Sequence, residues 1–186
     1  MKNFVLSFLL LLAVEAGAQE LKDFTLFNTQ DGKSISLSSF KNNAGVLVIF
    51  TSHECPFDNY YKDRIKELAG EYVGKVQVVL INSNQEPQES KEQMAIHYKD
   101  LNVPYLADKD QVAMELFGAR RSPEAFLLST ANSKFSVVYS GAIDDNPQLA
   151  KDVKQSFLKE AIDKLLAGQK IEPATQRASG CTIRRK

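Results

Sequence analysis

The chain has 186 residues, a formal net charge of zero and a sequence pI of about 6.7. This length suits one domain with its own hydrophobic core and is short for two. The balanced charge argues against nucleic acid as a partner, because that function needs an excess of basic side chains on one face. The basic stretch at residues 183–186 is typical of a solvated terminus.

The first 18 residues have the three-part pattern of a cleaved secretory signal. Lys2 precedes an apolar run of about eleven residues, and small residues follow at Ala16 and Ala18. The run is too short to cross a bilayer as a permanent anchor, and no cysteine follows it to carry a lipid. We therefore expect cleavage near Ala18 and an exported product, periplasmic or secreted, without stable membrane insertion.

Strand and helix patterns alternate along the rest of the chain. Apolar runs rich in β-branched residues predict buried strands at 44–50, 75–82 and 124–128, and the alternating segment 135–139 suits a strand near the sheet edge. Apolar residues at spacings of three and four predict helices over 57–72, 89–101, 110–117 and 147–167. Strands that alternate with helices predict an α/β fold whose sheet is covered on both faces.

The predicted elements give a simple domain organisation. Residues 1–18 form the signal peptide, and residues 19–168 form one domain. Residues 169–186 are polar and lack periodicity, so we interpret them as an extended tail that carries Cys181.

Cys55 has the surroundings of a reactive thiol. It follows the predicted strand 44–50 and precedes Pro56, and proline is favoured at the first position of a helix. The free N–H groups and the positive end of the helix dipole at that point favour thiolate over thiol. An inert buried cysteine is the less favoured interpretation.

Neither a metal nor a bound cofactor is expected. His53, Glu54, Cys55 and Asp58 are close in sequence, but their spacing fits no zinc pattern. No nucleotide, flavin or haem motif occurs in the chain.

The segment FTSHECPF, residues 50–57, resembles the active-site segment of thioredoxin-fold proteins, and most closely that of the bacterial peroxiredoxin-like group of AhpC/TSA type. Nearly the whole chain after Leu21 supports the resemblance, with matches at INSN (81–84), VPYLAD (103–108), FGARRSPEAFLL (117–128), YSGAIDD (139–145), LLAGQKI (165–171) and GCTIRR (180–185). It implies a thioredoxin-like fold, with a central mixed β-sheet and helices on both faces.

The chain departs from that group at Ser52, where the first cysteine of a C-x-x-C pair usually stands. Thioredoxin chemistry needs two adjacent thiols, so a local exchange centre is absent. Ser52 and Cys55 instead resemble the hydroxyl-x-x-Cys arrangement of true peroxiredoxins, in which the hydroxyl hydrogen-bonds near the thiolate and helps to hold the peroxide. The proline that those enzymes carry shortly before the hydroxyl is absent from residues 47–49.

The resemblance also implies roles for residues outside this segment. Arg121, or its neighbour Arg120, is the expected arginine that stabilises the thiolate and orients a peroxide. Ser122-Pro123 matches the cis-proline that faces the active cysteine, so we expect a cis bond there. Cys181 is a resolving thiol, a structural bridge to Cys55 or an unpaired thiol, and all three remain open; a bridge would contribute about 4–5 kcal/mol on the loop-entropy model.

The expected function is that of an exported, peroxiredoxin-like thiol oxidoreductase. Cys55 would reduce hydroperoxides or oxidised thiols, and an external dithiol reductant of thioredoxin type would recycle it. Pro56 and Pro123 would support the substrate site. The alternative is a non-catalytic thioredoxin-fold binding or scaffold module in the periplasm, in which loss of the first cysteine ended redox turnover.

Overall fold

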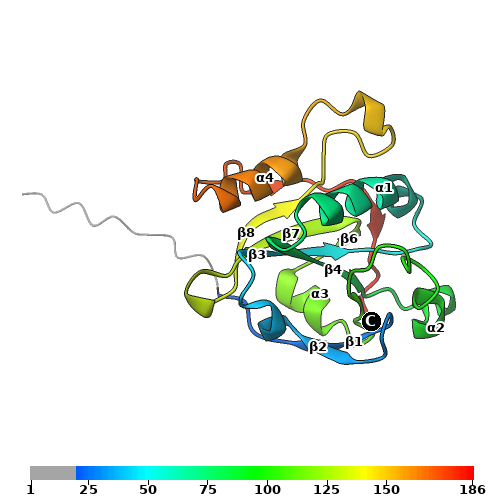
Figure 1. The fold of residues 1–186 in the computed structure, drawn as a ribbon. Coiled ribbons are helices and arrows are strands. Elements are labelled where there is room, and N and C mark those ends of the chain that lie inside the picture. Colours follow the sequence, from blue (N-terminus) through cyan, green and yellow to red (C-terminus); the bar gives the residue numbers. More distant parts are fainter. Residues whose placement is uncertain (1–19) are drawn as a thin grey trace, which may run out of the picture.

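A computed structural model describes residues 20–186 (Figure 1). The expected signal peptide therefore lies outside the described residues. The strands are β1 (Thr25–Asn28), β2 (Ser34–Ser36), β3 (Gly45–Phe50), β4 (Val76–Asn82), β5 (Tyr105–Ala107), β6 (Arg121–Ser122), β7 (Glu124–Ser129), β8 (Ser136–Gly141), β9 (Thr175–Gln176) and β10 (Cys181–Thr182). Eight of them form one sheet in the order β2-β1-β5-β4-β3-β7-β8-β9, and β10 pairs with β6 in a second, small sheet.

Strand β3 lies in the interior of the main sheet and is buried over its whole length. It runs parallel to β4 and antiparallel to β7, so the sheet is mixed. Its side chains alternate between two cores: Leu47 and Ile49 face one, whereas Val48 and Phe50 face the other. A strand with an apolar core on each side needs helices on both faces, as the sequence predicts.

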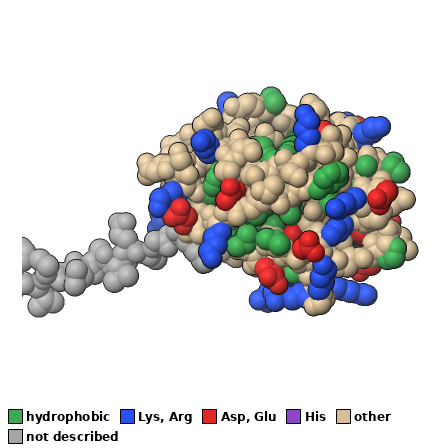
Figure 2. Space-filling view, turned by 90° about the horizontal axis from the view of Figure 1, so that it is seen from below, with side chains coloured by type: hydrophobic (Ala, Val, Ile, Leu, Met, Phe, Trp, Pro, Cys, Tyr) green, Lys and Arg blue, Asp and Glu red, His purple; other side chains and the backbone are tan. Residues whose placement is uncertain are grey.

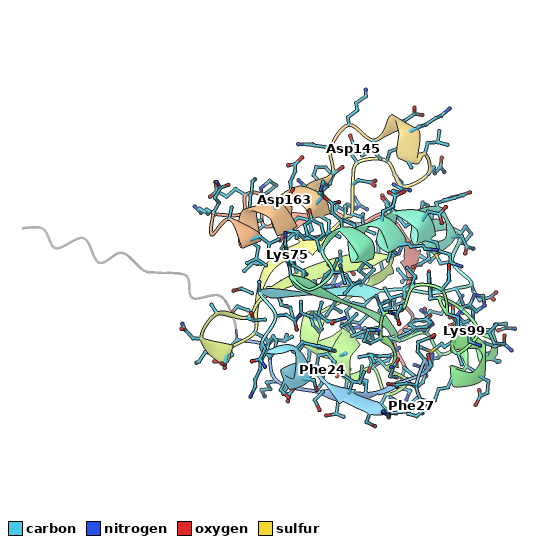
Figure 3. The ribbon with its side chains drawn as sticks, in the orientation of Figure 1. Phe24, Phe27, Lys75, Lys99, Asp145 and Asp163 are labelled. Carbon is cyan, nitrogen blue, oxygen red and sulfur yellow. A yellow bond between two sulfur atoms is a disulfide. The ribbon has the colours of Figure 1, made fainter. Side chains whose placement is uncertain are left out.

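Helices cover both faces (Figure 1). On one face lie α1 (Pro56–Glu71) and α4 (Phe157–Leu166), which bury Ile65 and Ile162 against the sheet. On the other lies α3 (Val112–Phe117). Phe24 lies on the same side of the sheet as α3, at the bottom of Figure 3. Its ring contacts that of Phe117 edge to face, with 6.0 Å between the ring centroids. The expected α/β sheet with helices on both faces is thus confirmed.

The predicted helix over 89–101 is wrong in length. The α-helix α2 spans only Lys91–Met94, and Tyr98 adopts a left-handed backbone with φ of 55°. Met94, Tyr98 and Leu101 are nevertheless buried together. Their spacing therefore indicates only that the three side chains are buried on the same side of the segment. A series of turns can bury them there as well as a helix can.

The last predicted helix begins about ten residues too early. The side-chain oxygen of Asn146 accepts hydrogen bonds from the backbone N–H groups of Gln148 and Leu149, which forms a turn. A single 3₁₀ turn at Ala150–Asp152 follows, and α4 begins only at Phe157. The amphipathic pattern is thus interrupted by local side-chain to backbone bonding.

The tail is extended and packs against the domain. Strand β9 adds to the edge of the main sheet beside β8. The approach there is so close that a Cβ atom on Gly141 would overlap the carbonyl of Gln176, and the φ of Gly141 is +118°. Glycine at 141 is therefore needed for this edge of the sheet.

The surface carries charges of both signs. Lys and Arg side chains are interspersed with Asp and Glu over the face seen in Figure 2. Within residues 20–186, no helix has the length and apolar character needed to cross a membrane.

The packing of α1 predicts the effect of truncating Ile65, which is fully buried. Ile65→Ala should lower the free energy of unfolding by about 2–5 kcal/mol, because it removes apolar contacts and leaves a cavity. Val73→Ala is the control, because Val73 is 76% exposed. This substitution should change the free energy of unfolding by less than about 0.5 kcal/mol. Chemical denaturation of the oxidised proteins measures both, and equal effects would contradict this packing.

Candidate functional site

Cys55 lies where β3 is followed by α1. Its backbone is extended and it caps the helix, with Pro56 at the first helical position, as the sequence predicts. The side chain is 3% exposed and forms a disulfide with Cys181, 126 residues later in the chain, with 6.0 Å between the Cα atoms. The interpretation of Cys181 as an unpaired thiol is therefore wrong for this structure, whereas the resolving and structural interpretations both need such a bond.

Backbone pairing brings Cys181 to Cys55. Strand β10 runs antiparallel to β6, with Cys181 opposite Ser122. Ile183 is 4% exposed in the core beneath the sheet, and its N–H donates to the carbonyl of Arg120 at 3.0 Å. The Gln111 side chain donates to the carbonyl of Arg184 at 2.7 Å. The tail is thus held by contacts that do not depend on the disulfide.

Gly180 permits this close approach. A Cβ atom at this position would meet the carbonyl group of Ser122 and would lie 3.1 Å from the backbone nitrogen of Pro123. Backbone atoms cannot move aside as a flexible side chain can. Only glycine lets the tail lie against β6 at this point.

Arg121 and Arg120 contribute to the docking of the tail. The Arg121 guanidinium donates to the carbonyl of Gly180 at 2.9 Å, and the backbone N–H groups of both arginines donate to Glu124. Within residues 20–186, no hydrogen bond joins either guanidinium to Cys55. The role of Arg121 towards a thiolate therefore stays a prediction.

The expected cis bond at Ser122-Pro123 is confirmed. The carbonyl oxygen of Ser122 lies 3.3 Å from the sulfur of Cys55, which brings the segment before Pro123 directly against the disulfide. Pro123 itself is buried.

The hydroxyl of Ser52 is engaged in a buried network. It donates to a carboxylate oxygen of Glu89 and accepts from the backbone N–H of Cys55 at 3.1 Å. The backbone N–H of Glu54 donates to the same oxygen of Glu89 at 3.2 Å. Glu89 therefore fixes the loop that precedes Cys55.

The Glu89 carboxylate is buried, yet it is ionised. Burial alone would raise its pKa, but hydrogen bonds from His53, Ser52 and Asn82 lower the pKa of Glu89 to about 2. The His53 ring places Nδ1 3.0 Å from Glu89 and Nε2 2.5 Å from the carbonyl of Gln88, and both partners are acceptors. Burial opposes the imidazolium form, but these acceptors raise the pKa of His53.

Asp58 is a second buried carboxyl, one turn into α1 from Cys55. Its Oδ1 accepts from the hydroxyl of Thr51 at 2.5 Å, whereas its Oδ2 and the hydroxyl of Ser122 find no hydrogen-bond partner among residues 20–186. The side chain is fully buried, and burial raises the pKa of Asp58 well above its usual range. The nearby Glu89 charge acts in the same direction.

A cleft of about 390 Å³ opens beside the disulfide. Both sulfur-bearing residues line it, together with Ser52, Glu54, Asn84, Glu86, Gln88, Glu89, Thr182 and Arg184. Two strand ends build it, because β3 and β4 are parallel and the segments after them therefore meet at one edge of the sheet.

Sequence reasoning missed Glu89 as a part of this site, included Asn84 only within the matched segment 81–84, and considered Asp58 only as a metal ligand. For Glu89 and Asn84 the available signal was topological: two neighbouring parallel strands predict that residues following the second lie beside Cys55. Asp58 lies only three residues after Cys55, but the sequence does not show that its side chain is buried. Among residues 20–186, no group of three His, Cys, Asp or Glu side chains is arranged to hold a metal ion.

Comparisons with known proteins agree with this geometry. A sequence profile described as the AhpC/TSA family matches residues 18–145. A structure from Sinorhizobium meliloti 1021, described as a hypothetical protein, is 31% identical with a TM-score of 0.81 and covers 91% of this chain and 94% of its own. No curated protein matches the chain in sequence.

Two more distant structures share the fold. The exposed lipoprotein thioredoxin Etrx1 of Streptococcus pneumoniae is 23% identical with a TM-score of 0.57, over 76% of this chain and 99% of its own. Peroxidoxin BcpB of Mycobacterium tuberculosis is 20% identical with a TM-score of 0.53, over 81% of this chain and 93% of its own. The expected thioredoxin-like fold is thus confirmed.

The buried carboxyl of Asp58 predicts a specific pH dependence. Because its folded-state pKa is raised, the unfolded chain releases this proton first, and the free energy of unfolding falls as the pH rises from the usual aspartate pKa towards the folded value. Asp58→Asn, which keeps an acceptor for Thr51, should therefore be more stable than wild type at neutral pH and lose that advantage in acid. Chemical denaturation at several pH values measures these free energies of unfolding. The control is Asp63→Asn, at an exposed position on the same helix. A difference between Asp58→Asn and wild type that does not change with pH would contradict the prediction.

The close approach at Gly180 predicts that Gly180→Ala weakens the disulfide. The added methyl group must push the tail away from Ser122 and Pro123, so Cys181 spends less time near Cys55. The ratio of reduced to oxidised protein in a thiol redox buffer should therefore rise by about tenfold or more. Gly70→Ala, where an added Cβ meets no atom within 4 Å, should leave the equilibrium unchanged. Alkylation of free thiols reads out both variants, and equal titrations would refute the explanation.

Proposed function

Because the chain belongs to the AhpC/TSA family, we propose that it is an exported thiol-dependent oxidoreductase in which Cys55 reduces hydroperoxides or oxidised thiols. The disulfide between Cys55 and Cys181 at the edge of a cleft carries the proposal. It joins a cysteine at a helix N-terminus to a cysteine on a docked tail, which is an arrangement suited to reversible oxidation.

In the first step, the Cys55 thiolate attacks a peroxide oxygen. The O–O bond breaks, the leaving oxygen takes a proton, and Cys55 becomes a sulfenic acid. Placement of Cys55 before the 16-residue helix α1 favours the thiolate, because free N–H groups and the helix dipole stabilise negative charge there.

In the second step, the Cys181 thiolate attacks the sulfenic sulfur and the S–O bond breaks, which forms the disulfide and expels hydroxide that takes up a proton from solvent to leave as water. The pairing of β10 with β6 and the buried side chain of Ile183 support this role, because they hold Cys181 near Cys55 without the covalent bond. An external dithiol, of thioredoxin type, then returns both cysteines to thiols.

Four other residues have supporting roles in this proposal. Ser52 and Arg121 supply hydrogen bonds to charge that develops at the reacting sulfur. The contact of Ser52 with the N–H of Cys55 favours its part in this, and Arg121 also holds Gly180 of the tail. Pro56 starts the helix behind the thiolate, and Pro123 shapes the wall that faces it.

Export is part of the proposal. The pattern of residues 1–18 favours a cleaved secretory signal, and a stable disulfide suits the oxidising compartments that exported proteins reach.

The second candidate function is a non-catalytic binding or scaffold module with a structural disulfide. The engagement of Ser52 by Glu89 favours it, because the position of the usual first thiol has been converted into a satisfied, buried polar contact. A disulfide that closes so long a loop would then serve stability alone.

Hydrogen peroxide consumption by residues 19–186 with a dithiol reductant tests the proposal. Wild-type protein should turn over, and Cys55→Ser should lose activity by about a hundredfold or more, since it removes the nucleophile. Cys181→Ser should retain the first turnover and lose the intramolecular disulfide, so its Cys55 becomes labelled by a sulfenic-acid reagent.

Equal inertness of wild type and Cys55→Ser would refute peroxide as substrate. Slow labelling of reduced Cys55 by a thiol reagent at neutral pH would in addition favour the scaffold module, because a buried thiol without a depressed pKa reacts slowly.

A further inference from the structure

We propose that the stacked rings of His53 and His97 form a pH-sensitive latch, which holds the turns after α2 against the loop before Cys55 and opens in acid. These two residues are the histidines of the chain. Such control of the site does not depend on the reaction proposed above.

The two rings lie nearly parallel and in contact. Their centroids are 4.1 Å apart, and their planes differ by 9°. His53 lies in the loop between β3 and α1, whereas His97 lies in the turns that follow α2. The carbonyl of His97 accepts a hydrogen bond from the side chain of Gln30 at 3.3 Å. The stack therefore joins two segments that are far apart in the sequence.

The His53 ring is placed to carry a positive charge. Its Nδ1 lies 3.0 Å from the Glu89 carboxylate, and its Nε2 lies 2.5 Å from the carbonyl of Gln88. A neutral imidazole has one N–H and can donate to only one of these acceptors, whereas an imidazolium donates to both. Burial opposes the charged form, but the hydrogen bonds to Glu89 and to the carbonyl raise the pKa of His53.

The His97 ring is poorly placed to carry a second charge. Protonation of His97 would stack one imidazolium on another, and like charges at this separation repel each other. Burial and the charge on His53 both lower the pKa of His97. The closed stack therefore favours one positive charge on the pair and disfavours two.

The other charges around the stack do not remove this repulsion. Lys62 on α1 also lowers the pKa of His97, and it lies 3.8 Å from Asp100. Glu89 and Glu54 act in the opposite direction. Glu89 is already bound to the His53 ring, and Glu54 is exposed, so that solvent screens its charge.

The two shifts define the pH range in which the latch is closed. An unperturbed imidazole has a pKa of about 6.5. Because the pKa of His53 is raised in the closed form, its contribution to closure is complete below about 6.5 and is lost as the pH rises through the raised value. Because the pKa of His97 is lowered, closure weakens as the pH falls from about 6.5 towards the lowered value. The latch is therefore tightest near pH 6.5.

Opening of the latch reaches Cys55 through Glu89. His97 is half-buried and covers one face of the His53 ring, whose bond to Glu89 is buried. The same carboxylate accepts from the backbone N–H of Glu54 at 3.2 Å, in the loop directly before Cys55. When His97 moves away, water reaches this pair of charges and weakens their attraction. The loop before Cys55 then loses part of its support.

Titration of the two rings by NMR tests the coupling. The ring C–H signals of the oxidised protein are followed across the range in which imidazole titrates. We expect His53 to titrate above pH 6.5 and His97 below it, at least about one pH unit apart. His53→Gln should raise the pKa of His97 towards about 6.5, because it removes the neighbouring charge.

Amide hydrogen exchange measures the opening itself. The control variant is His97→Phe, which keeps a stacked aromatic ring without a group that can be protonated. Two hydrogen-bonded amides report on the latch: that of Glu54 and that of Leu101, which donates to the carbonyl of Tyr98 at 3.0 Å. Between about pH 6.5 and about pH 5, their exchange in wild type should rise by about threefold or more relative to the variant.

Two results would overturn the proposal. One is titration of both histidines at the same pH in the wild-type protein, a measurement that needs no variant to fold. The other is a ratio of exchange rates, wild type to His97→Phe, that stays constant over this pH range. Neither readout involves peroxide or a reductant, so the proposed function is judged separately by the Cys55→Ser assay.

Discussion

The position of Cys181 over Cys55 depends on the pairing of β10 with β6. This pairing is short, and it relies on Gly180, because any larger residue would collide with the backbone of Ser122 and Pro123. The bend of the chain before Pro123 and the extended tail therefore have to fit each other at one point. A disulfide, a cleft and a buried tail residue, Ile183, all follow from that fit.

Ser52 places a buried hydroxyl directly beside Cys55. A hydroxyl in the interior needs hydrogen-bond partners, and here the Glu89 carboxylate and the N–H of Cys55 provide them. The carboxylate in turn is held by Asn82 and His53, so a charged network lies directly behind the cysteine. The sulfur bonded to Cys55 comes instead from a distant segment of the chain, at Cys181.

The sequence predicts the framework of the molecule better than its details. The continuous apolar runs of β3, β4 and β7, and the junction of β3 with α1 at Cys55, are visible because burial on both faces leaves a strong local pattern. The two-residue strands β6, β9 and β10 are too short to show periodicity, and their backbone partners lie far away in the chain. The spacing of Met94 and Tyr98 misleads for a related reason, since turns and helices can bury the same positions.

The residues of the site also differ in how well the sequence predicts them. Cys55 and Pro56 are recognisable from neighbouring residues, and the cis bond before Pro123 from the resemblance. Glu89 and Asp58 are not, because their importance comes from burial and from partners on other elements.

The enclosed length of chain between the two cysteines has a mechanical consequence. The disulfide joins positions 126 residues apart, so a force pulling on the two ends of the domain would pass through the covalent bond and bypass everything between them. Only the strands before Cys55 and the last few residues could then be drawn out. Reduction would place α1 and the strands from β4 to β9 under the same load, so the extensibility of the protein would report its oxidation state.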